Sequence, residues 1–277
     1  MKIYAFADEA NTQMDGQIAA MLRNHLNGLE IRGVDGTNVS DITLEKAKEI
    51  RDKLTAAGLS VWSIGSPIGK INIVKDDYPA HLEKFRHTLE IAKILEAKNI
   101  RIFSFYITEN KPHEQYREEV VCRLKEMVSI AAGAGIELCH ENEKGIYGDN
   151  AQHCLELYQA IPELKGVFDP ANFVQCGQNS LQAWELLHSH IKYLHIKDAM
   201  LDGSIVPAGA GAGNVAEILA LFRKQGGNTV TVEPHLAIFD GLAGLEQSGN
   251  TSEIGKLVYP SNDAAFDAAC EALRKLL

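Results

Sequence analysis

The sequence predicts a single-domain α/β fold, a (β/α)8 barrel of the TIM type, and three observations predict it. Eight short β-type runs are spread along the 277 residues, and most gaps between them have the periodicity of amphipathic helices. Polar residues stand at the ends of these runs as far as the last one, as expected where all strands point to one functional face. Barrels of this type often have about 250 residues in one domain, so the length fits.

The eight predicted strands are short and apolar, and in chain order they span residues 3–6, 28–31, 60–64, 100–104, 136–141, 167–169, 193–196 and 229–233. The clearest helix lies between the third and fourth strands. There an apolar stripe recurs at steps of three and four residues, formed by Leu82, Phe85, Leu89, Ala92 and Leu95. A doubly wound open sheet is the competing fold, but it would concentrate its site at one switch point, whereas polar strand ends continue here to the last strand.

The pattern changes after the last predicted strand. Gly and Ser become frequent and no strong period remains, so we expect an irregular segment, about 236–262, that covers part of one barrel end. A C-terminal helix should follow, with Arg274 and Lys275 in its last turn. Residues 1–277 are assigned to one domain.

Composition disfavours several classes of protein. The formal net charge is −10 and the Lys and Arg residues form no run, which argues against a nucleic-acid partner. The five cysteines are odd in number and include no C-x-x-C pair, so we expect neither a disulfide framework nor a zinc knuckle, and a reducing cytoplasm is the expected location. The sequence has no signal-peptide pattern and no stretch of about 18 apolar residues, so we expect no membrane partner.

Four polar residues close apolar runs at roughly the spacing of one strand-plus-helix unit: Glu141, Asp169, His195 and Glu233. Strand ends converge on one face of a parallel barrel, so these side chains are predicted to meet there. Three carboxylates and one imidazole form an oxygen-rich set that suits Mn²⁺ or Mg²⁺ better than a thiolate-bound structural zinc. In the alternative interpretation, each carboxylate only caps the helix after its strand.

Two of these carboxylates, Glu141 and Glu233, are the candidates for acid/base catalysis. They come from opposite sides of the predicted barrel, and a glutamate oxygen that faces a substrate can take or return a proton. A cation that holds a ketone and its neighbouring hydroxyl stabilises the enediolate formed when the α-proton leaves. The predicted chemistry is therefore proton transfer next to a carbonyl.

Further polar residues of the strand ends and loops are candidate substrate contacts: Arg32, Ser66, Lys70, Tyr106, Asn172, Lys197 and His235. Lys197 is either a solvated rim lysine or a ligand of a substrate oxygen, and Asp198 caps or pairs with it. The alternating Gly-Ala segment from Pro207 to Gly213 is interpreted as a flexible loop over the barrel mouth. As an alternative, its amides bind a phosphate or hydroxyl, although it lacks a complete G-x-G-x-x-G pattern.

The strand-end set resembles the xylose-isomerase-like barrel superfamily, in particular the sugar phosphate isomerase/epimerase group, which includes D-tagatose 3-epimerase and hydroxypyruvate isomerase relatives. The resemblance covers nearly the whole chain. It rests on six segments: FADE (6–9), GLEIR (28–32), LCHEN (138–142), FDPAN (168–172), LHIKD (194–198) and VEPH (232–235).

That resemblance implies that Glu141, Asp169, His195 and Glu233 are the four metal ligands and that Glu141 and Glu233 are the acid/base pair. It implies one divalent cation, Mn²⁺ first, with Mg²⁺, Co²⁺ or Zn²⁺ as alternatives, and a sugar or keto-sugar substrate. Barrels of this kind often pair, so a homo-oligomer is compatible with it. Asn172 departs from the D-x-x-H pattern common in the group, because an amide replaces the histidine.

Three other functions are alternatives to an isomerase or epimerase. A metal-dependent dehydratase or lyase, acting on a keto-sugar or keto-cyclitol, begins with the same proton removal, and the sequence does not separate the two. A phosphodiesterase like endonuclease IV needs extra histidines for three zinc ions, whereas Ser66, Ser104 and Asn172 stand near the expected positions. A non-catalytic sugar-binding protein is disfavoured by the intact Glu141 and Glu233 pair.

Overall fold

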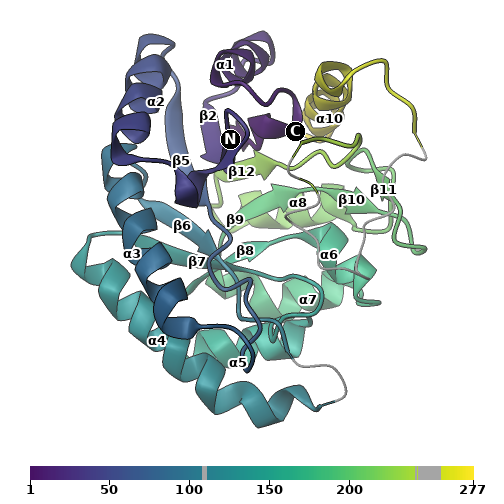
Figure 1. Cartoon of the computed structure of the whole chain (residues 1–277). Helices are drawn as coiled ribbons and strands as arrows, with labels where there is room; N and C mark the ends of the chain where they lie inside the picture. The colour runs from purple at the N-terminus through teal and green to yellow at the C-terminus, as the bar shows by residue number, and fades with distance from the viewer. Residues whose placement is uncertain (108–110, 241, 243–256) are drawn as a thin grey trace.

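Eight parallel strands form a closed barrel in the computed structural model of the chain, which describes residues 1–107, 111–240, 242 and 257–277 (Figure 1). Around the barrel the strands follow the order β1-β12-β9-β8-β7-β6-β5-β2. Their bounds are β1 Lys2–Ala5, β2 Gly28–Ile31, β5 Ser60–Gly65, β6 Asn99–Ile102, β7 Glu137–Glu141, β8 Lys165–Phe168, β9 Ile191–Ile196 and β12 Thr229–Val232. The predicted single-domain (β/α)8 barrel is confirmed.

The strand ends differ by a few residues from the prediction, and the hydrogen bonds explain the differences. The fourth barrel strand, β6, ends at Ile102 and not at residue 104, because the Phe103 amide donates to the Ile68 carbonyl in the loop after β5. The strand β8 ends at Phe168, because Asp169 leaves the sheet to begin a helix. These ends matter because the polar candidates follow them directly.

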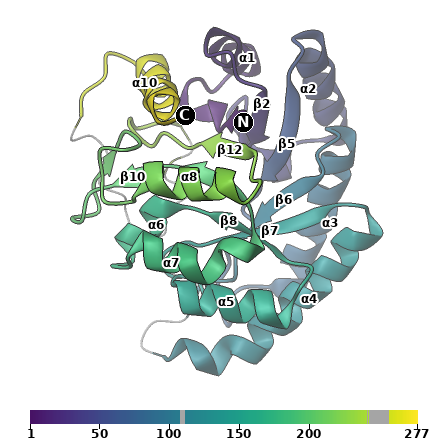
Figure 2. The same cartoon turned by 180° about the vertical axis from the view of Figure 1, so that it is seen from behind.

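Helices surround the barrel and cover its outer face (Figure 2). The longer ones are α1 Met14–Arg23, α2 Leu44–Ala56, α3 Tyr78–Ile94, α4 Arg117–Gly133, α5 Ala151–Ala160, α6 Pro170–Gln175, α7 Ser180–Leu187, α8 Val215–Lys224 and α10 Asn262–Leu276. Short 3-10 turns are η1 Ala7–Glu9, η2 Val39–Asp41, η3 His113–Tyr116 and η4 His188–His190. Two small antiparallel pairs join β3 Gly33–Val34 to β4 Thr37–Asn38, and β10 Asp198–Ala199 to β11 Ile205–Val206.

Helix α3 illustrates how the sequence specifies this layer. The Asp77 side chain accepts a hydrogen bond from the Ala80 amide and so caps the first turn. The predicted apolar stripe is buried against the barrel, with Phe85 and Ala92 fully inaccessible. Burial of an apolar stripe of this kind is the main source of helix stability in a barrel.

The two chain termini lie close together in both views, where α10 packs beside α1 (Figures 1 and 2). Arg23 of α1 forms ion pairs with Asp263 and Asp267 of α10, so the last helix is held against the first. The irregular segment predicted at about 236–262 falls mainly on residues outside the described ones. Within the described residues, no helix has the length and apolar character needed to span a membrane.

Candidate active site

Four buried side chains converge at the carboxyl ends of the strands: Glu141 at the end of β7, Asp169 after β8, His195 in β9 and Glu233 after β12. Their potential ligand atoms all lie within 4.8 Å of one another. The parallel register explains this, because His195 pairs with Thr231, two residues before Glu233, and Glu141 pairs with Val167, two residues before Asp169. The structure thus brings together the four residues predicted from their spacing; we call them the quartet.

His195 is oriented by carboxylates on both sides of its ring. Its Nδ1 lies 3.0 Å from Glu141 Oε1 and 3.5 Å from Glu233 Oε2, whereas its Nε2 lies 3.0 Å from Glu30 Oε2. The Tyr193 hydroxyl donates to the other Glu30 oxygen at 2.8 Å. A carboxylate bound to one ring nitrogen keeps the proton there and leaves the other nitrogen free to act as a ligand. Burial opposes protonation of His195, but Glu141 and Glu30 raise its pKa well above the usual range, so both ring nitrogens carry protons without a cation. A cation bound by the quartet would displace the proton from Nδ1, while Glu30 keeps the proton on Nε2.

Three cations contact the carboxylates of the quartet. The distance from Arg101 Nη1 to Glu141 Oε2 is 2.6 Å, and that from Arg32 Nη1 to Glu233 Oε1 is 3.2 Å. The ammonium of Lys197 lies 3.0 Å from Asp169 Oδ2 and 3.1 Å from Glu233 Oε2. Lys197 is only 8% exposed, so it is no solvated rim lysine.

The surroundings of each carboxyl group set its pKa. Burial by itself would raise the pKa of Glu141, but His195 and Arg101 hold it well below its usual range. Burial opposes ionisation of Glu233 too, yet Lys197, His235 and His195 hold its pKa well below the usual range. Burial raises the pKa of Asp169 to about 7, against the opposing effect of Lys197. Both glutamates are consequently ionised at neutral pH.

The quartet fits a divalent cation by the chemistry of its atoms. Three carboxylates and one imidazole supply the oxygen-rich ligands that Mn²⁺ and Mg²⁺ take. Asp169 Oδ2 is buried and has no well-aligned hydrogen bond, although the Lys197 ammonium is 3.0 Å away. A buried carboxylate oxygen in that state is expected to have a further partner.

Asp169 shows that capping and site formation are compatible. Its Oδ1 accepts the Asn172 amide at 2.9 Å and caps helix α6, while Oδ2 faces Lys197. Asn172, the off-pattern residue, donates from its side-chain amide to the Asn142 carbonyl at 2.9 Å and approaches Glu141 Oε1 at 3.4 Å. The amide therefore supports the Glu141 side of the quartet.

A second acidic group adjoins Glu233. Arg32 donates to Asp8 at 2.9 Å and to Glu9 at 3.0 Å, and the His235 amide donates to Glu9 Oε2 at 2.6 Å. Burial raises the pKa of Glu9 to about 8, although Arg32 opposes the shift. Asp8 and Arg32 line a cavity of about 330 Å³ together with Thr12, Asn38, Lys84 and Phe239, among others. This cavity is a candidate site for the part of a substrate that does not react.

The other predicted substrate contacts are divided between the quartet and the loops after β5 and β6. Arg32, Asn172, Lys197 and His235 lie beside the quartet, whereas Ser66, Lys70 and Tyr106 belong to the loops. The Ser66 hydroxyl is buried and donates to the Arg101 carbonyl at 2.7 Å, so it holds the loop in place and does not face a substrate. Lys70 pairs with Glu143 at 2.8 Å and lies over the Phe103 ring. Tyr106 packs with Phe103 and Ile146.

The Gly-Ala loop binds an anion that belongs to the chain itself. The amides of Gly209, Gly211 and Gly213 donate to the Asp198 carboxylate at 2.9, 3.0 and 2.8 Å. A Cβ on Gly211 or Gly213 would approach Asp198 within 2.6 Å, so glycine is required at these two positions. The expectation that Asp198 pairs with Lys197 is wrong, and the amides considered for a phosphate already have Asp198 as their acceptor.

Two residues that position the quartet were not among the predicted site residues. Glu30 lies within β2 and Arg101 within β6, and both are buried. A charged residue inside a short, mainly apolar strand is the available sequence signal, because charges are rarely buried without a partner. The pattern does not show which partner each one takes.

The comparisons with known proteins agree with this architecture. A comparison with curated protein sequences gives no significant match. Among solved structures, the chain is similar to the probable 3-DHS dehydratase AsbF from Bacillus anthracis, with a TM-score of 0.75, 18% identity, and 99% of each chain covered. It is also similar to 3-keto-D-glucoside 4-epimerase, YcjR, from E. coli (TM-score 0.71, 15% identity, 100% of this chain and 98% of that one).

A third similar structure is the IOLI protein with a bound zinc atom (TM-score 0.76, 16% identity, 100% of this chain and 98% of that one). At such identities these three structures show a shared fold. The sequence profile of a family described as the xylose isomerase-like TIM barrel matches residues 20–252, most of the chain. The chain therefore belongs to the xylose isomerase-like TIM barrel family.

Proposed function

We propose that this protein is a divalent-metal-dependent sugar isomerase or epimerase that moves a proton next to a carbonyl through an enediolate. The observation that carries the proposal is the buried quartet, in which Glu141 and Glu233 are ionised beside a position suited to a cation. The 3-keto-D-glucoside 4-epimerase and a D-allulose 3-epimerase from Methylomonas are among the similar structures, which supports this reaction class.

Each residue of the site has a role in this proposal. Glu141, Asp169, His195 and Glu233 hold the cation, with Mn²⁺ expected first and Mg²⁺, Co²⁺ or Zn²⁺ as alternatives. The bound cation polarises the substrate carbonyl and stabilises negative charge on its oxygen. Glu233 and Glu141 remove and return the proton, because both are ionised and come from different sides of the barrel. Lys197 donates to the substrate oxygen, and Arg32 binds hydroxyl groups at the edge of the adjoining cavity.

A dehydratase is the second candidate function, because the structurally similar AsbF is described as a probable 3-DHS dehydratase. Its first step needs the same α-proton removal, and the reactions diverge when a hydroxyl leaves the neighbouring carbon. The two candidates therefore share the quartet and differ in their products.

Deuterium exchange tests the proposed reaction. Ketoses and keto-glycosides, incubated with Mn²⁺-loaded protein in D₂O, should gain one deuteron on the carbon next to the carbonyl, as followed by NMR. An isomerase or epimerase returns the deuterated product at unchanged oxidation level and without loss of water, whereas a dehydratase gives an unsaturated product. If Mn²⁺-loaded protein labels no substrate of a broad panel faster than its Glu233→Gln variant, the proposal is wrong.

Lys197→Met should strengthen metal binding while it weakens turnover. The ammonium contacts two of the proposed ligands, and it repels a divalent cation at the same oxygens. Even with strong solvent screening, that repulsion over a few ångströms exceeds about 1.4 kcal/mol, so Mn²⁺ affinity should rise at least about tenfold. Calorimetric titration of substrate-free protein with Mn²⁺ measures this affinity, and Lys70→Met is the matched control. An unchanged or lower affinity would show that Lys197 does not oppose the cation.

A further inference from the structure

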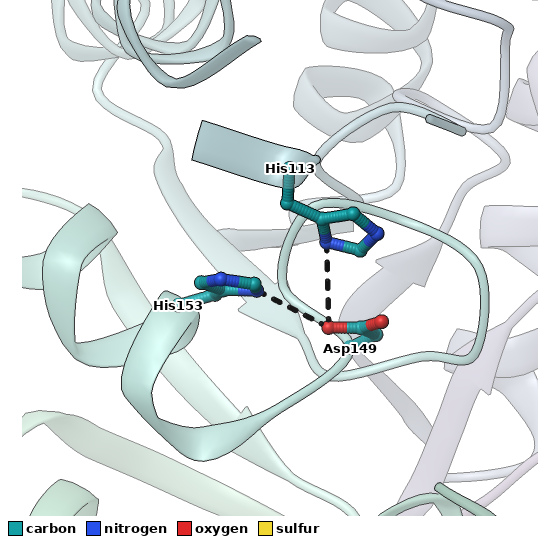
Figure 3. A group of neighbouring side chains, drawn as sticks. All are labelled: His113, Asp149 and His153. Atoms are coloured by element: carbon teal, nitrogen blue, oxygen red, sulfur yellow. Dashed lines mark hydrogen bonds and ion pairs between the residues drawn. The ribbon is translucent and has the colours of Figure 1, made fainter. Parts of the chain in front are cut away.

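A second cluster of potential metal ligands lies outside the quartet and shares no residue with it. His113 is in η3, in the connection between β6 and α4, while Asp149 precedes α5 and His153 is in its first turn. In Figure 3, both imidazole rings turn a nitrogen toward the same Asp149 oxygen. The cluster thus links the connection after β6 to the connection after β7, two neighbouring strands of the barrel.

The two distances to Asp149 are close to those between ligand atoms of a tetrahedral zinc, and all three ligand atoms lie within 4.8 Å of one another. His153 Nδ1 lies 3.3 Å and His113 Nδ1 3.6 Å from Asp149 Oδ1. Zinc with bonds of about 2.0–2.1 Å to nitrogen and oxygen places its ligand atoms about 3.3–3.4 Å apart. The side chains are 14–26% exposed, which leaves access for water as a fourth ligand.

The hydrogen bonds of Asn150 indicate that Nδ1 of His153 presents a lone pair to the cluster. Asn150 Oδ1 accepts the His153 amide, so its Nδ2 faces the cluster and lies 3.0 Å from Asp149 Oδ1 and 2.8 Å from His153 Nδ1. An amide nitrogen only donates, so this contact requires an unprotonated Nδ1 on His153. Asp149 Oδ1 lies 3.3 Å from the same nitrogen, and its hydrogen bond raises the pKa of His153, so a proton competes with a cation for this lone pair.

His113 supplies an independent observation. Its Nδ1 is buried and has no hydrogen-bond partner in the part of the chain that the structure describes. The ring is held against its neighbours, stacked on His153 with ring centroids 5.0 Å apart and tilted over Tyr147 at 6.2 Å. A buried polar atom without a partner, directed at an anion, is a position that a cation would complete.

We propose that His113, Asp149 and His153 form a second metal site, which binds Zn²⁺ and ties the two connections together. Two imidazoles and one carboxylate favour zinc over Mn²⁺ or Mg²⁺, which take mainly oxygen ligands. On binding, the ion replaces the hydrogen bond from the Asn150 amide to His153. The site is structural, and it is independent of the quartet and of the proposed function.

Zinc binding to metal-stripped protein tests this site, with His195→Gln as the background that weakens the quartet. In that background one equivalent of Zn²⁺ should remain after dialysis and raise the melting temperature. Adding His113→Gln and His153→Gln should abolish both the zinc retention and the rise in melting temperature. Adding His188→Gln, on η4, should leave the zinc retention and the melting temperature unchanged. Circular dichroism verifies that each variant is folded. If the variant with both substitutions is not folded, His113→Gln or His153→Gln alone replaces it in the test.

Two results would overturn the inference. One is that the His195→Gln protein retains no zinc, in which case the cluster is a carboxylate held by a protonated histidine. The other is that the protein lacking His113 and His153 retains as much zinc as its His188→Gln counterpart, in which case the zinc is bound elsewhere.

Discussion

Glu233→Gln is expected to lower kcat by about 10³-fold, the middle of the range that a positioned acid or base contributes. The amide is nearly the same size and still offers one oxygen, but it cannot accept the substrate proton. In the wild type, Lys197, His235 and His195 hold the pKa of Glu233 well below its usual range. The carboxylate is therefore ionised at neutral pH and can accept the proton. Steady-state kinetics at saturating Mn²⁺ and deuterium exchange together measure the loss.

Glu233 is a cleaner position for this test than Glu141. When Glu233 is neutralised, Lys197 still pairs with Asp169, and Arg32 still pairs with Asp8 and Glu9. Arg101, by contrast, pairs with Glu141, so Glu141→Gln removes the carboxylate from a guanidinium that is only 4% exposed. A buried cation without its partner costs several kcal/mol. Both substitutions should lower kcat strongly, but only Glu233→Gln should leave the unfolding free energy nearly unchanged.

Control measurements separate chemistry from binding in Glu233→Gln. The Mn²⁺ affinity of the variant, measured without substrate, shows whether the lower kcat is caused by weaker metal binding. Kinetics at saturating Mn²⁺ remove that contribution. Asn38→Ala, at the adjoining cavity, is a matched change that should affect KM more than kcat, because Asn38 lines the cavity and does not contact the quartet. If Glu233→Gln keeps the wild-type rate with bound metal, Glu233 is not the base.

The quartet could be predicted because barrel topology alone brings strand ends together. Any polar residue at the end of a barrel strand faces the same mouth, so the positions of Glu141, Asp169, His195 and Glu233 in the sequence were sufficient. The role of Glu30 could not be predicted in this way, because Glu30 lies inside β2. Its contact with His195 crosses the barrel between strands that are far apart in the chain. Strand alternation gives the direction of a side chain but not its partner.

Loop contacts were the least predictable part. The glycine amides that bind Asp198 depend on the backbone path of the Gly-Ala loop, which composition does not specify. His153 has the sequence context of an ordinary surface helix residue, and its approach to His113 depends on how two connections lie against each other. Short-range patterns locate elements, whereas contacts between connections depend on the assembled barrel.

Arg32→Met should destabilise the protein in a pH-dependent manner. Arg32 is buried among Asp8, Glu9 and Glu233 and is their shared cation. Without it, three buried carboxyl groups lose their shared cation, and removing one partner from a buried ionic group costs about 3–5 kcal/mol. The loss should be larger at pH 8 than at pH 5.5, because keeping a proton on Glu9 in the folded state costs more at the higher pH.

The sign of the pH dependence follows from Glu9. Its pKa is about 8 in the folded wild type and near 4.5 when unfolded, so the folded state binds the extra proton between these values. Its favourable contribution to stability is complete below about pH 4.5 and is lost as the pH rises through about 8. Arg32→Met removes the group that opposes this shift, so the folded-state pKa of Glu9 rises further and the decline continues to higher pH.

Urea unfolding of metal-stripped protein at pH 5.5 and pH 8 measures the effect. Relative to wild type, Arg32→Met should lose clearly more unfolding free energy at pH 8 than at pH 5.5, because protonation at the lower pH relieves the repulsion among the carboxylates. Adding Glu9→Gln should recover part of the loss at pH 8 and little at pH 5.5, because the amide carries no charge at either pH. Equal losses at the two pH values would mean that Arg32 stabilises the fold by packing between Phe6 and Phe239, whose rings lie 4.4 and 4.9 Å from its guanidinium, and not by its charge.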